Sequence, residues 1–258
     1  MDFIVDALQV GKRFEGKSGP VEALSGIDLQ VEPGEFVSLI GPSGCGKSTL
    51  LRLIGDLLRP TEGTITVNGK TPELARIQGD YGIAFQQATL LEWRTVRRNV
   101  ELPLELAGVA PESRLSRANE LLAMVGLAEF SDHHPWQLSG GMQQRVAIAR
   151  ALGQSPPLLL MDEPFGALDE MTREAMQQEL MQIWRETGTT VLFVTHSIPE
   201  AVFLSTRVVI MSARPGRITR RIDIDLAQPR ESEIRQSPRF FELLTAVREG
   251  LRQGGGVA

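Results

Sequence analysis

Cysteine is almost absent from this sequence, which has only Cys45 among its 258 residues. A lone cysteine cannot form a disulfide within the chain, and this scarcity fits a reducing compartment. Long apolar runs are missing as well, since no stretch approaches the roughly 18 apolar residues that a membrane-crossing helix needs. The N-terminus also lacks the basic flank and the apolar core of a signal peptide. We therefore expect a chain that is soluble by itself.

An excess of positive charge is also missing. The 27 Lys and Arg residues are outnumbered by 32 Asp and Glu residues, which gives a formal net charge of -5 and an isoelectric point of about 5.4. A strongly basic stripe is the usual footprint of nucleic-acid binding, so this balance argues mildly against such a partner. No internal repeat is present, and the length suits one globular domain or one domain with an inserted lobe.

A glycine-rich segment with the sequence GPSGCGKST, residues 41–49, is the first motif that carries chemistry. It matches the phosphate-binding pattern G-x-x-x-x-G-K-S, in which glycines let the backbone N–H groups point at a phosphate. A helix is predicted to begin at Lys47, so that its positive end meets the anion. Lys47 would then reach the β- and γ-phosphates, and the Ser48 hydroxyl would ligate Mg²⁺. The expected nucleotide-binding residues are Gly41, Pro42, Ser43, Gly44, Cys45, Gly46, Lys47, Ser48 and Thr49.

An apolar segment that ends in two acidic residues, Leu158 to Glu163, is the second motif. It predicts a buried strand with Asp162 at its tip, where a carboxylate can hold the shell of a magnesium ion. Glu163 can then activate water as a general base. An Asp-Glu pair after a strand is usually a solvated turn, but this pair follows a phosphate loop, which favours the catalytic interpretation.

The order of predicted strands and helices indicates an α/β fold. Helical spacing of apolar residues predicts a helix over Lys47 to Leu58, and short apolar runs predict strands at 35–40, 158–161, 191–194 and 208–211. Strands that alternate with helices imply a mostly parallel sheet. We expect one domain over residues 1–258, with a core of about 1–94 and 155–218, an inserted helical subdomain of about 95–154 and a short C-terminal extension, 219–258.

A third segment, Leu138 to Arg145 with the sequence LSGGMQQR, resembles the signature of ATP-binding-cassette (ABC) ATPases. The resemblance implies the P-loop NTPase fold of an ABC cassette, in which antiparallel N-terminal strands accompany the parallel sheet. It also implies that ATP is bound with Mg²⁺ and hydrolysed, and that two copies of the chain close on the nucleotide. Ser139, Gly140 and Gly141 would then touch the ATP bound to the partner. Ser139 is in addition an ordinary helix N-cap, and the two roles do not exclude each other.

The same resemblance assigns further residues. Gln86 matches the Q-loop glutamine, which joins the γ-phosphate site to the helical subdomain, and His196 matches the switch histidine that senses the γ-phosphate. Phe14 matches the aromatic residue that stacks on adenine. Asp169 matches the D-loop aspartate, although Gly166 stands where serine is more usual. The implied catalytic residues are Lys47, Gln86, Glu163 and His196, and the implied magnesium ligands are Ser48, Gln86 and Asp162.

Two less specific segments, Leu90 to Gly108 and Ser212 to Ile218, look like the importer branch for nitrate, sulfonate, taurine and similar small solutes. The implied assembly is two copies of this chain at the cytoplasmic face of the membrane, beneath permease subunits that a solute-binding protein feeds. Trp93 is expected either to anchor the permease or to belong to the core of the helical subdomain. Glu92 departs from the proline that is usual at its position.

Two other functions stay open at this stage. The ATPase of an ABC exporter or of a lipid-transport system would share the nucleotide motifs. A soluble ABC ATPase that acts on ribosomes or DNA is less favoured, because ribosome-acting members resemble tandem cassettes and DNA-repair members carry a long coiled coil. The solute is not encoded in either case, since a cassette does not touch it.

Overall fold

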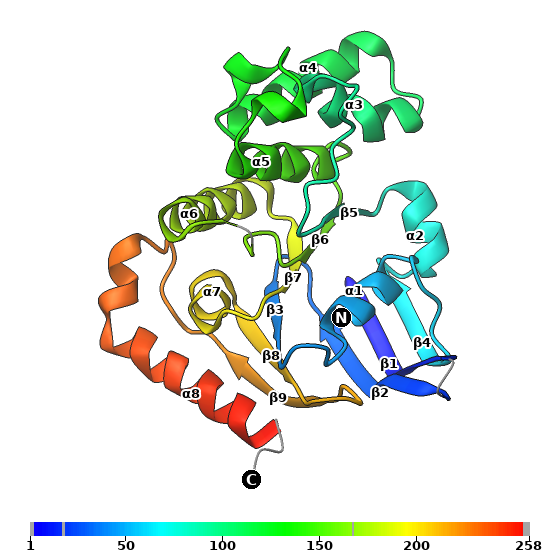
Figure 1. The fold of residues 1–258 in the computed structure, drawn as a ribbon, viewed down its shortest axis with the longest axis vertical. Helices are drawn as coiled ribbons and strands as arrows, with labels where there is room; N and C mark the ends of the chain where they lie inside the picture. Colours follow the sequence, from blue (N-terminus) through cyan, green and yellow to red (C-terminus); the bar gives the residue numbers. More distant parts are fainter. Residues whose placement is uncertain (1–2, 17–18, 167, 255–258) are drawn as a thin grey trace. The chain divides into compact units, whose positions relative to one another are not determined.

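The computed structural model describes residues 3–16, 19–166 and 168–254, and these form two compact units (Figure 1). The first unit contains the residues up to Asp80 and those from Thr190 onward, and the second runs from Tyr81 to Thr189. Ala167, in the predicted D-loop, lies outside the described residues. The expected division into core, helical subdomain and extension stays a prediction.

An antiparallel sheet of three strands begins the first unit. Its strands β1 (Val5–Phe14), β2 (Val21–Val31) and β4 (Glu62–Val67) lie in the order β2-β1-β4. After β4 the backbone N–H groups of Val67 and Lys70 each bond the carbonyl of the other residue, at 2.8 and 3.0 Å. Asn68 and Gly69 make this turn with positive φ angles of 51° and 71°, which asparagine and glycine tolerate best. The expected antiparallel N-terminal strands are confirmed.

A second group of strands in the first unit supplies its parallel part. Strand β3 (Phe36–Ile40) pairs in parallel with β7 (Thr190–Val194) and with β8 (Arg207–Met211). Strand β9 (Ile218–Asp223) pairs with β8 in the antiparallel sense. Every residue of β3 and β7 is buried, which explains why their sequences are mainly apolar, with Ser38 and Thr190 as the exceptions, rather than alternating. The predicted mostly parallel α/β core is confirmed.

The helix predicted over Lys47 to Leu58 is wrong at its C-terminal end. Helix α1 spans Lys47–Ile54, and the N–H groups of Leu57 and Leu58 bond the Arg52 carbonyl at 2.8 and 3.2 Å. Asp56 adopts a left-handed φ of 49°, which turns the chain back on the last helical turn and ends the helix. Leu57, expected on the apolar face, is therefore 48% exposed.

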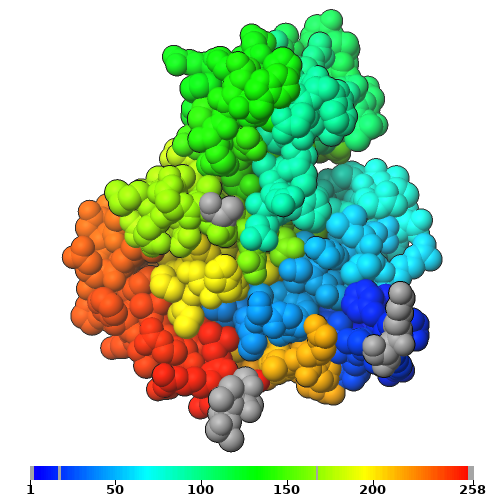
Figure 2. All heavy atoms as spheres, in the orientation of Figure 1, coloured from blue at the N-terminus to red at the C-terminus, as the bar shows by residue number. Residues whose placement is uncertain are grey.

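The first unit is completed by α2 (Pro72–Gln78), α7 (Ile198–Leu204), the short 3-10 helix η3 (Ser232–Gln236) and α8 (Pro238–Gly254). Helix α8 packs on α7, β8 and β9 and buries Phe240, Leu243 and Val247. The atoms of this last segment, orange to red in Figure 2, lie directly against the yellow atoms of α7. The end of the described chain is thus part of the packed core of the first unit.

The second unit is mainly helical. Its strands β5 (Tyr81–Ala84) and β6 (Leu158–Asp162) pair in parallel. Its helices α3, α4 and α5 pack on one another, and α6 packs on α5. None of the helices in the described part of the chain has both the length and the apolarity that a bilayer span requires. The bounds of the helices are α3 (Val96–Leu106), α4 (Pro111–Met124), η1 (Ala128–Phe130), η2 (Pro135–Gln137), α5 (Gly140–Ala151) and α6 (Glu170–Thr187).

Candidate functional site

The phosphate loop, residues 41–49, leads from buried β3 into α1. Gly46 caps α1 in a left-handed conformation with φ 100°, and as a glycine it supplies no side chain that could bond the first N–H groups of the helix. A Cβ atom at Gly46 would lie 2.5 Å from Leu24 Cδ2 and 3.0 Å from the Ala23 carbonyl oxygen, and residues with a Cβ atom rarely adopt this φ, so the position favours glycine. Uncapped N–H groups at a helix N-terminus attract anions, and this loop therefore offers a place for phosphate.

Lys47 extends its amino group inside this loop. The side chain is only 6% exposed, and Nζ donates hydrogen bonds to the carbonyl oxygens of Gly41 at 2.9 Å and Pro42 at 3.1 Å. Cys45 is buried beside it, with Sγ 3.8 Å from Nζ. Ser48 and Thr49 follow in the first turn of α1 and are half-buried. The loop thus holds a positive charge next to its own N–H groups, which is the arrangement that phosphate binding needs.

Two further predicted residues lie in the first unit. Phe14 ends β1 with 38% of its surface exposed, and Lys12 Nζ lies 5.1 Å from the centroid of its ring. His196 is exposed in the connection between β7 and α7. Both side chains are accessible, so a ligand can reach them.

The two acidic residues of the second motif end strand β6 in the second unit. Asp162 is 7% exposed, while the next residue, Glu163, is half-buried. Glu163 has a positive φ of 48°, a left-handed conformation that costs free energy for a residue with a Cβ atom. Strained backbone of this kind persists where the surroundings hold it, and it is concentrated at functional sites.

The segment around Gln86 is held by the signature helix. Gln86 is exposed just after β5, and Gln144 Nε2 on α5 donates to the carbonyl of the preceding Phe85 at 3.0 Å. The Arg150 guanidinium donates to the carbonyls of Ala88 and Thr89, each at 2.8 Å. Sequence reasoning missed Arg150 altogether and took Gln144 only as part of a pattern. Nothing local in the sequence reveals either contact, because the bonded residues are 59 to 62 positions apart.

The signature itself begins α5. Ser139 Oγ accepts a hydrogen bond from the N–H of Met142 at 3.3 Å, so its predicted N-cap role is confirmed. Ser139 and Gly140 are exposed, whereas Gly141 is buried against α6. A Cβ atom at Gly141 would lie 2.9 Å from Thr172 Cγ2, and one at Gly140 would meet nothing within 4 Å. The exposed start of this helix is therefore open to a ligand.

Asp169 begins the neighbouring helix α6. Its Oδ1 accepts a hydrogen bond from the N–H of Thr172 at 3.1 Å, which makes it the N-cap. Hydrogen bonds from Thr172 lower the pKa of Asp169 below its usual value, so the carboxylate is charged at neutral pH. Gly166, where serine was the expected residue, lies against Gln86: a Cβ atom there would be 3.1 Å from Gln86 Nε2. The missing side chain leaves room for Gln86.

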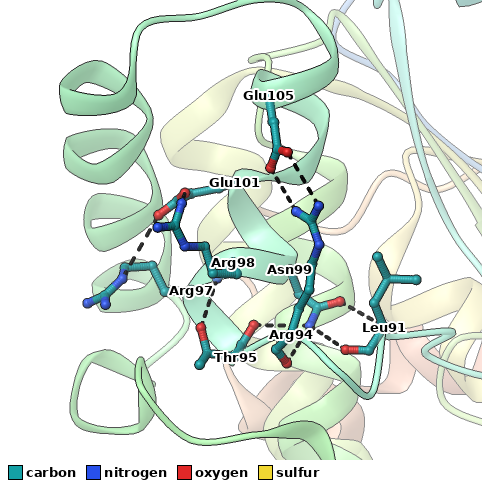
Figure 3. Close-up of polar contacts among 8 residues, drawn as sticks. All are labelled: Leu91, Arg94, Thr95, Arg97, Arg98, Asn99, Glu101 and Glu105. Carbon is teal, nitrogen blue, oxygen red and sulfur yellow. Dashed lines mark hydrogen bonds and ion pairs between the residues drawn. The ribbon is translucent and has the colours of Figure 1, made fainter.

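The turn that follows the Gln86 segment is fixed by Asn99, which is completely buried on α3 (Figure 3). Its Oδ1 accepts from the N–H of Leu91 at 2.7 Å, and its Nδ2 donates to the carbonyls of Leu91, Arg94 and Thr95 at 3.0 to 3.2 Å. Arg94 also pairs with Glu105 through two hydrogen bonds. Trp93, in the middle of this turn, is 76% exposed. The alternative that Trp93 belongs to a core is therefore wrong.

The predicted residues are thus distributed over both units. Phe14, the phosphate loop and His196 belong to the first unit. Gln86, Ser139 to Gly141, Asp162, Glu163 and Asp169 belong to the second. Each of these residues lies at or just after the end of a strand, or at the start of a helix. Their roles toward a nucleotide stay predictions.

Comparison with known proteins bears directly on these motifs. A family model described as ABC transporter matches residues 24–166, a range that includes the phosphate loop, the signature and the acidic pair. The chain is 45% identical over 257 residues to a nitrate import ATP-binding protein of Synechocystis sp., covering 96% of this chain and 95% of the relative. It is 48% identical over 234 residues to a taurine import ATP-binding protein of Rhizobium johnstonii, covering 88% of each.

A solved structure with a similar fold is a dimeric ATP-binding cassette in a post-hydrolysis state, bound to ADP and Pi. It has a TM-score of 0.76 and 40% sequence identity, and the match covers 86% of this chain and 100% of that one.

Proposed function

This chain belongs to the ABC transporter ATP-binding family, and on that premise we propose that it is the ATP-hydrolysing subunit of an importer for a small solute of the nitrate, sulfonate or taurine class. The observation that carries the proposal is the phosphate loop, where a buried lysine and an uncapped helix N-terminus lie together. The import proteins named above, which match almost the whole chain, support the choice of import over export.

The residues present fit ATP and Mg²⁺. Lys47 Nζ is held by backbone carbonyls, which phosphate oxygens would replace as acceptors. The Ser48 hydroxyl, the Gln86 amide oxygen and the Asp162 carboxylate are the oxygen donors that Mg²⁺ prefers, so we assign these residues as its ligands. When bound, Mg²⁺ neutralises charge on the phosphates.

Each remaining residue has a chemical role in this proposal. Glu163 takes a proton from the attacking water as general base. His196 senses the γ-phosphate, and the accessible ring of Phe14 stacks on adenine. Ser139, Gly140 and Gly141 present the start of α5 to the ATP held by a second copy of the chain, with Asp169 beginning the adjacent helix.

The assembly that we propose is a pair of these chains bound peripherally to the cytoplasmic face of a membrane permease. The dimeric cassette in the comparison supports the pairing. The exposed indole of Trp93 suits a contact with the permease, because aromatic side chains supply much of the binding energy in protein interfaces. Co-purification of the chain with a permease and a solute-binding protein tests this assembly.

Glu163→Gln is the substitution that tests catalysis. It keeps the shape and the strained backbone of the site but removes the base, so turnover of ATP should fall by about 10²-fold or more. Binding of ATP should persist, and the dimer should accumulate with ATP bound, since hydrolysis is what reopens it. The measurements are steady-state ATPase activity and size-exclusion chromatography with ATP. Glu129→Gln, an exposed residue of η1, is the matched control. Near-normal ATPase activity of Glu163→Gln would reject the assignment.

A further inference from the structure

The C-terminal end of α7 is capped by a side chain from outside the helix. Phe203, Leu204 and Ser205 are completely buried there, although the last carbonyls of a helix have no partner within it. Arg230, which is itself only 5% exposed, donates through one guanidinium nitrogen to the carbonyls of Val202 at 3.3 Å, Phe203 at 2.8 Å and Ser205 at 2.8 Å. A cation at this position also complements the negative end of the helix dipole.

This guanidinium remains a cation despite its burial. Removal from water lowers the pKa of Arg230 to about 10, which leaves the group charged at neutral pH. Arg235 adds a second cation from the same segment, with its guanidinium carbon 3.8 Å from the centroid of the Phe203 ring. The segment between β9 and α8 therefore holds the end of α7 through two arginines.

The same end of α7 is also tied to the strand that carries the phosphate loop. The hydroxyls of Ser205 and Ser38 lie 2.5 Å apart, and both residues are completely buried. Ser38 belongs to β3, which leads into Gly41. Arg230 thus caps the end of a helix that is also hydrogen-bonded to β3, the strand that leads into the phosphate loop.

The N-terminal end of α7 fixes the connection in which His196 lies. The hydroxyl of Thr195 donates to the Glu200 carboxylate at 2.5 Å and accepts from the N–H of Ser197 at 2.9 Å. Ser197 caps the helix by accepting from the N–H of Glu200. His196 therefore sits between two residues that are both bonded to the first turn of α7, so a shift of the helix moves the histidine backbone.

From these contacts we propose that Arg230 is a positioning residue for His196, which it orients through α7. Helix α7 has seven residues and a length of about 10 Å. So short a helix has little stability of its own and keeps its place through tertiary contacts. The inference rests on the proposed function, in which His196 senses the γ-phosphate. If Arg230 positions His196, the segment between β9 and α8 contributes to hydrolysis, although it lies far along the sequence from the phosphate loop.

Histidine NMR of the full-length, nucleotide-free chain tests the positioning directly. The sequence has three histidines, of which His133 and His134 belong to the second unit and serve as internal references. In Arg230→Met the ring signals of His196 should shift or broaden, while those of His133 and His134 stay unchanged. The His196 signals are assigned by their loss in His196→Ala.

Kinetics supply the second readout. Arg230→Met should lower kcat by about tenfold or more, as misplacement of a site residue by about 1 Å does. KM for ATP should stay at the wild-type value, because the phosphate loop is intact. Arg239→Met is the matched control: Arg239 is an exposed residue of α8 that pairs with Asp225 and Glu242. It should change neither readout.

Failure of the positioning proposal and failure of the proposed function give different results in these experiments. If Arg230→Met does not fold, Arg230→Lys, which keeps the charge and loses the guanidinium, is judged by the same two readouts. A wild-type His196 spectrum or a wild-type kcat in the folded variant overturns the proposal, as does an equal loss in Arg239→Met. Absence of ATPase activity from the wild-type chain would instead overturn the proposed function, and the NMR readout would still decide whether Arg230 positions His196.

Discussion

A single buried amide, that of Asn99, orders the turn that carries Trp93. It uses its oxygen and its nitrogen on four backbone groups of residues 91–95 (Figure 3). A turn whose backbone is bonded in this way is rigid, and its exposed indole is presented in one orientation. The chemistry of one residue thus determines the shape of a surface.

Asn99→Leu should therefore destabilise the chain. The leucine has a similar volume but removes the hydrogen-bond partner of the Leu91 N–H and of the Arg94 carbonyl, whereas the Leu91 carbonyl still accepts from the N–H of Arg94. Each polar group left without a partner away from water costs about 1–3 kcal/mol. We expect the free energy of unfolding to fall by about 2–4 kcal/mol, measured by urea denaturation. Gln87→Leu, at an exposed position of the preceding segment, is the control and should change it by less than about 0.5 kcal/mol. A loss below about 1 kcal/mol in Asn99→Leu would contradict this account.

At the scale of elements, α5 links two parts of the proposed chemistry within the second unit. Its first residues are the signature, and its later residues Gln144 and Arg150 bond the backbone on both sides of Gln86. Because the signature and the residues that bond the Gln86 segment are on the same rigid helix, the positions of the signature and of Gln86 depend on each other. Burial lowers the pKa of Arg150, and a guanidinium paired with two carbonyls in this way is a structural cation rather than a proton donor.

Gln144→Leu tests this linkage. The substitution keeps the packing of α5 but releases the Phe85 carbonyl, so Gln86 should lose its fixed position. We expect kcat for ATP hydrolysis to fall by about tenfold with a smaller change in KM. Arg117→Met, which removes a half-buried arginine of α4 that bonds Glu120 and Ser155 in the same unit, should leave both constants unchanged. Equal kcat values for Gln144→Leu and the wild type would show that the contact has no catalytic consequence.

At the scale of the whole molecule, the proposed function requires two chains, because the signature of one is assigned to the nucleotide of the other. The structure identifies Gly140 as the better position to test this. A side chain at Gly141 would press on Thr172, whereas one at Gly140 meets open space, so Gly140→Asp should fold normally. Its carboxylate would then repel the partner's phosphates at the start of α5.

Mixing Gly140→Asp chains with Lys47→Ala chains should restore ATPase activity that each variant alone lacks. In a mixed dimer both lesions fall on one shared site, and the other site is intact. The measurement is ATPase activity of the mixture against each variant at the same total concentration, with melting temperatures as the folding control. Full activity of Gly140→Asp alone would rule out a role for the signature in the partner's site.

Much of this protein could be predicted from its sequence. The phosphate loop and the acidic pair are runs of consecutive residues, and their chemistry depends on local backbone geometry. The sequence alone therefore indicates what these residues can do. The buried strands β3 and β7 were predictable for a similar reason, because short segments made mainly of apolar residues have few other stable placements.

The tertiary structure alone decided the rest. It ended α1 at Ile54, exposed Trp93, and joined Arg150 to Thr89 across 61 positions and Arg230 to Ser205 across 25. An arginine that bonds the backbone carbonyls of a distant segment has no periodicity and no motif, and in the sequence it is indistinguishable from a surface arginine. Its partners are chosen by the packing of distant elements, because only the folded chain buries the end of α7 and brings Arg230 to its carbonyls.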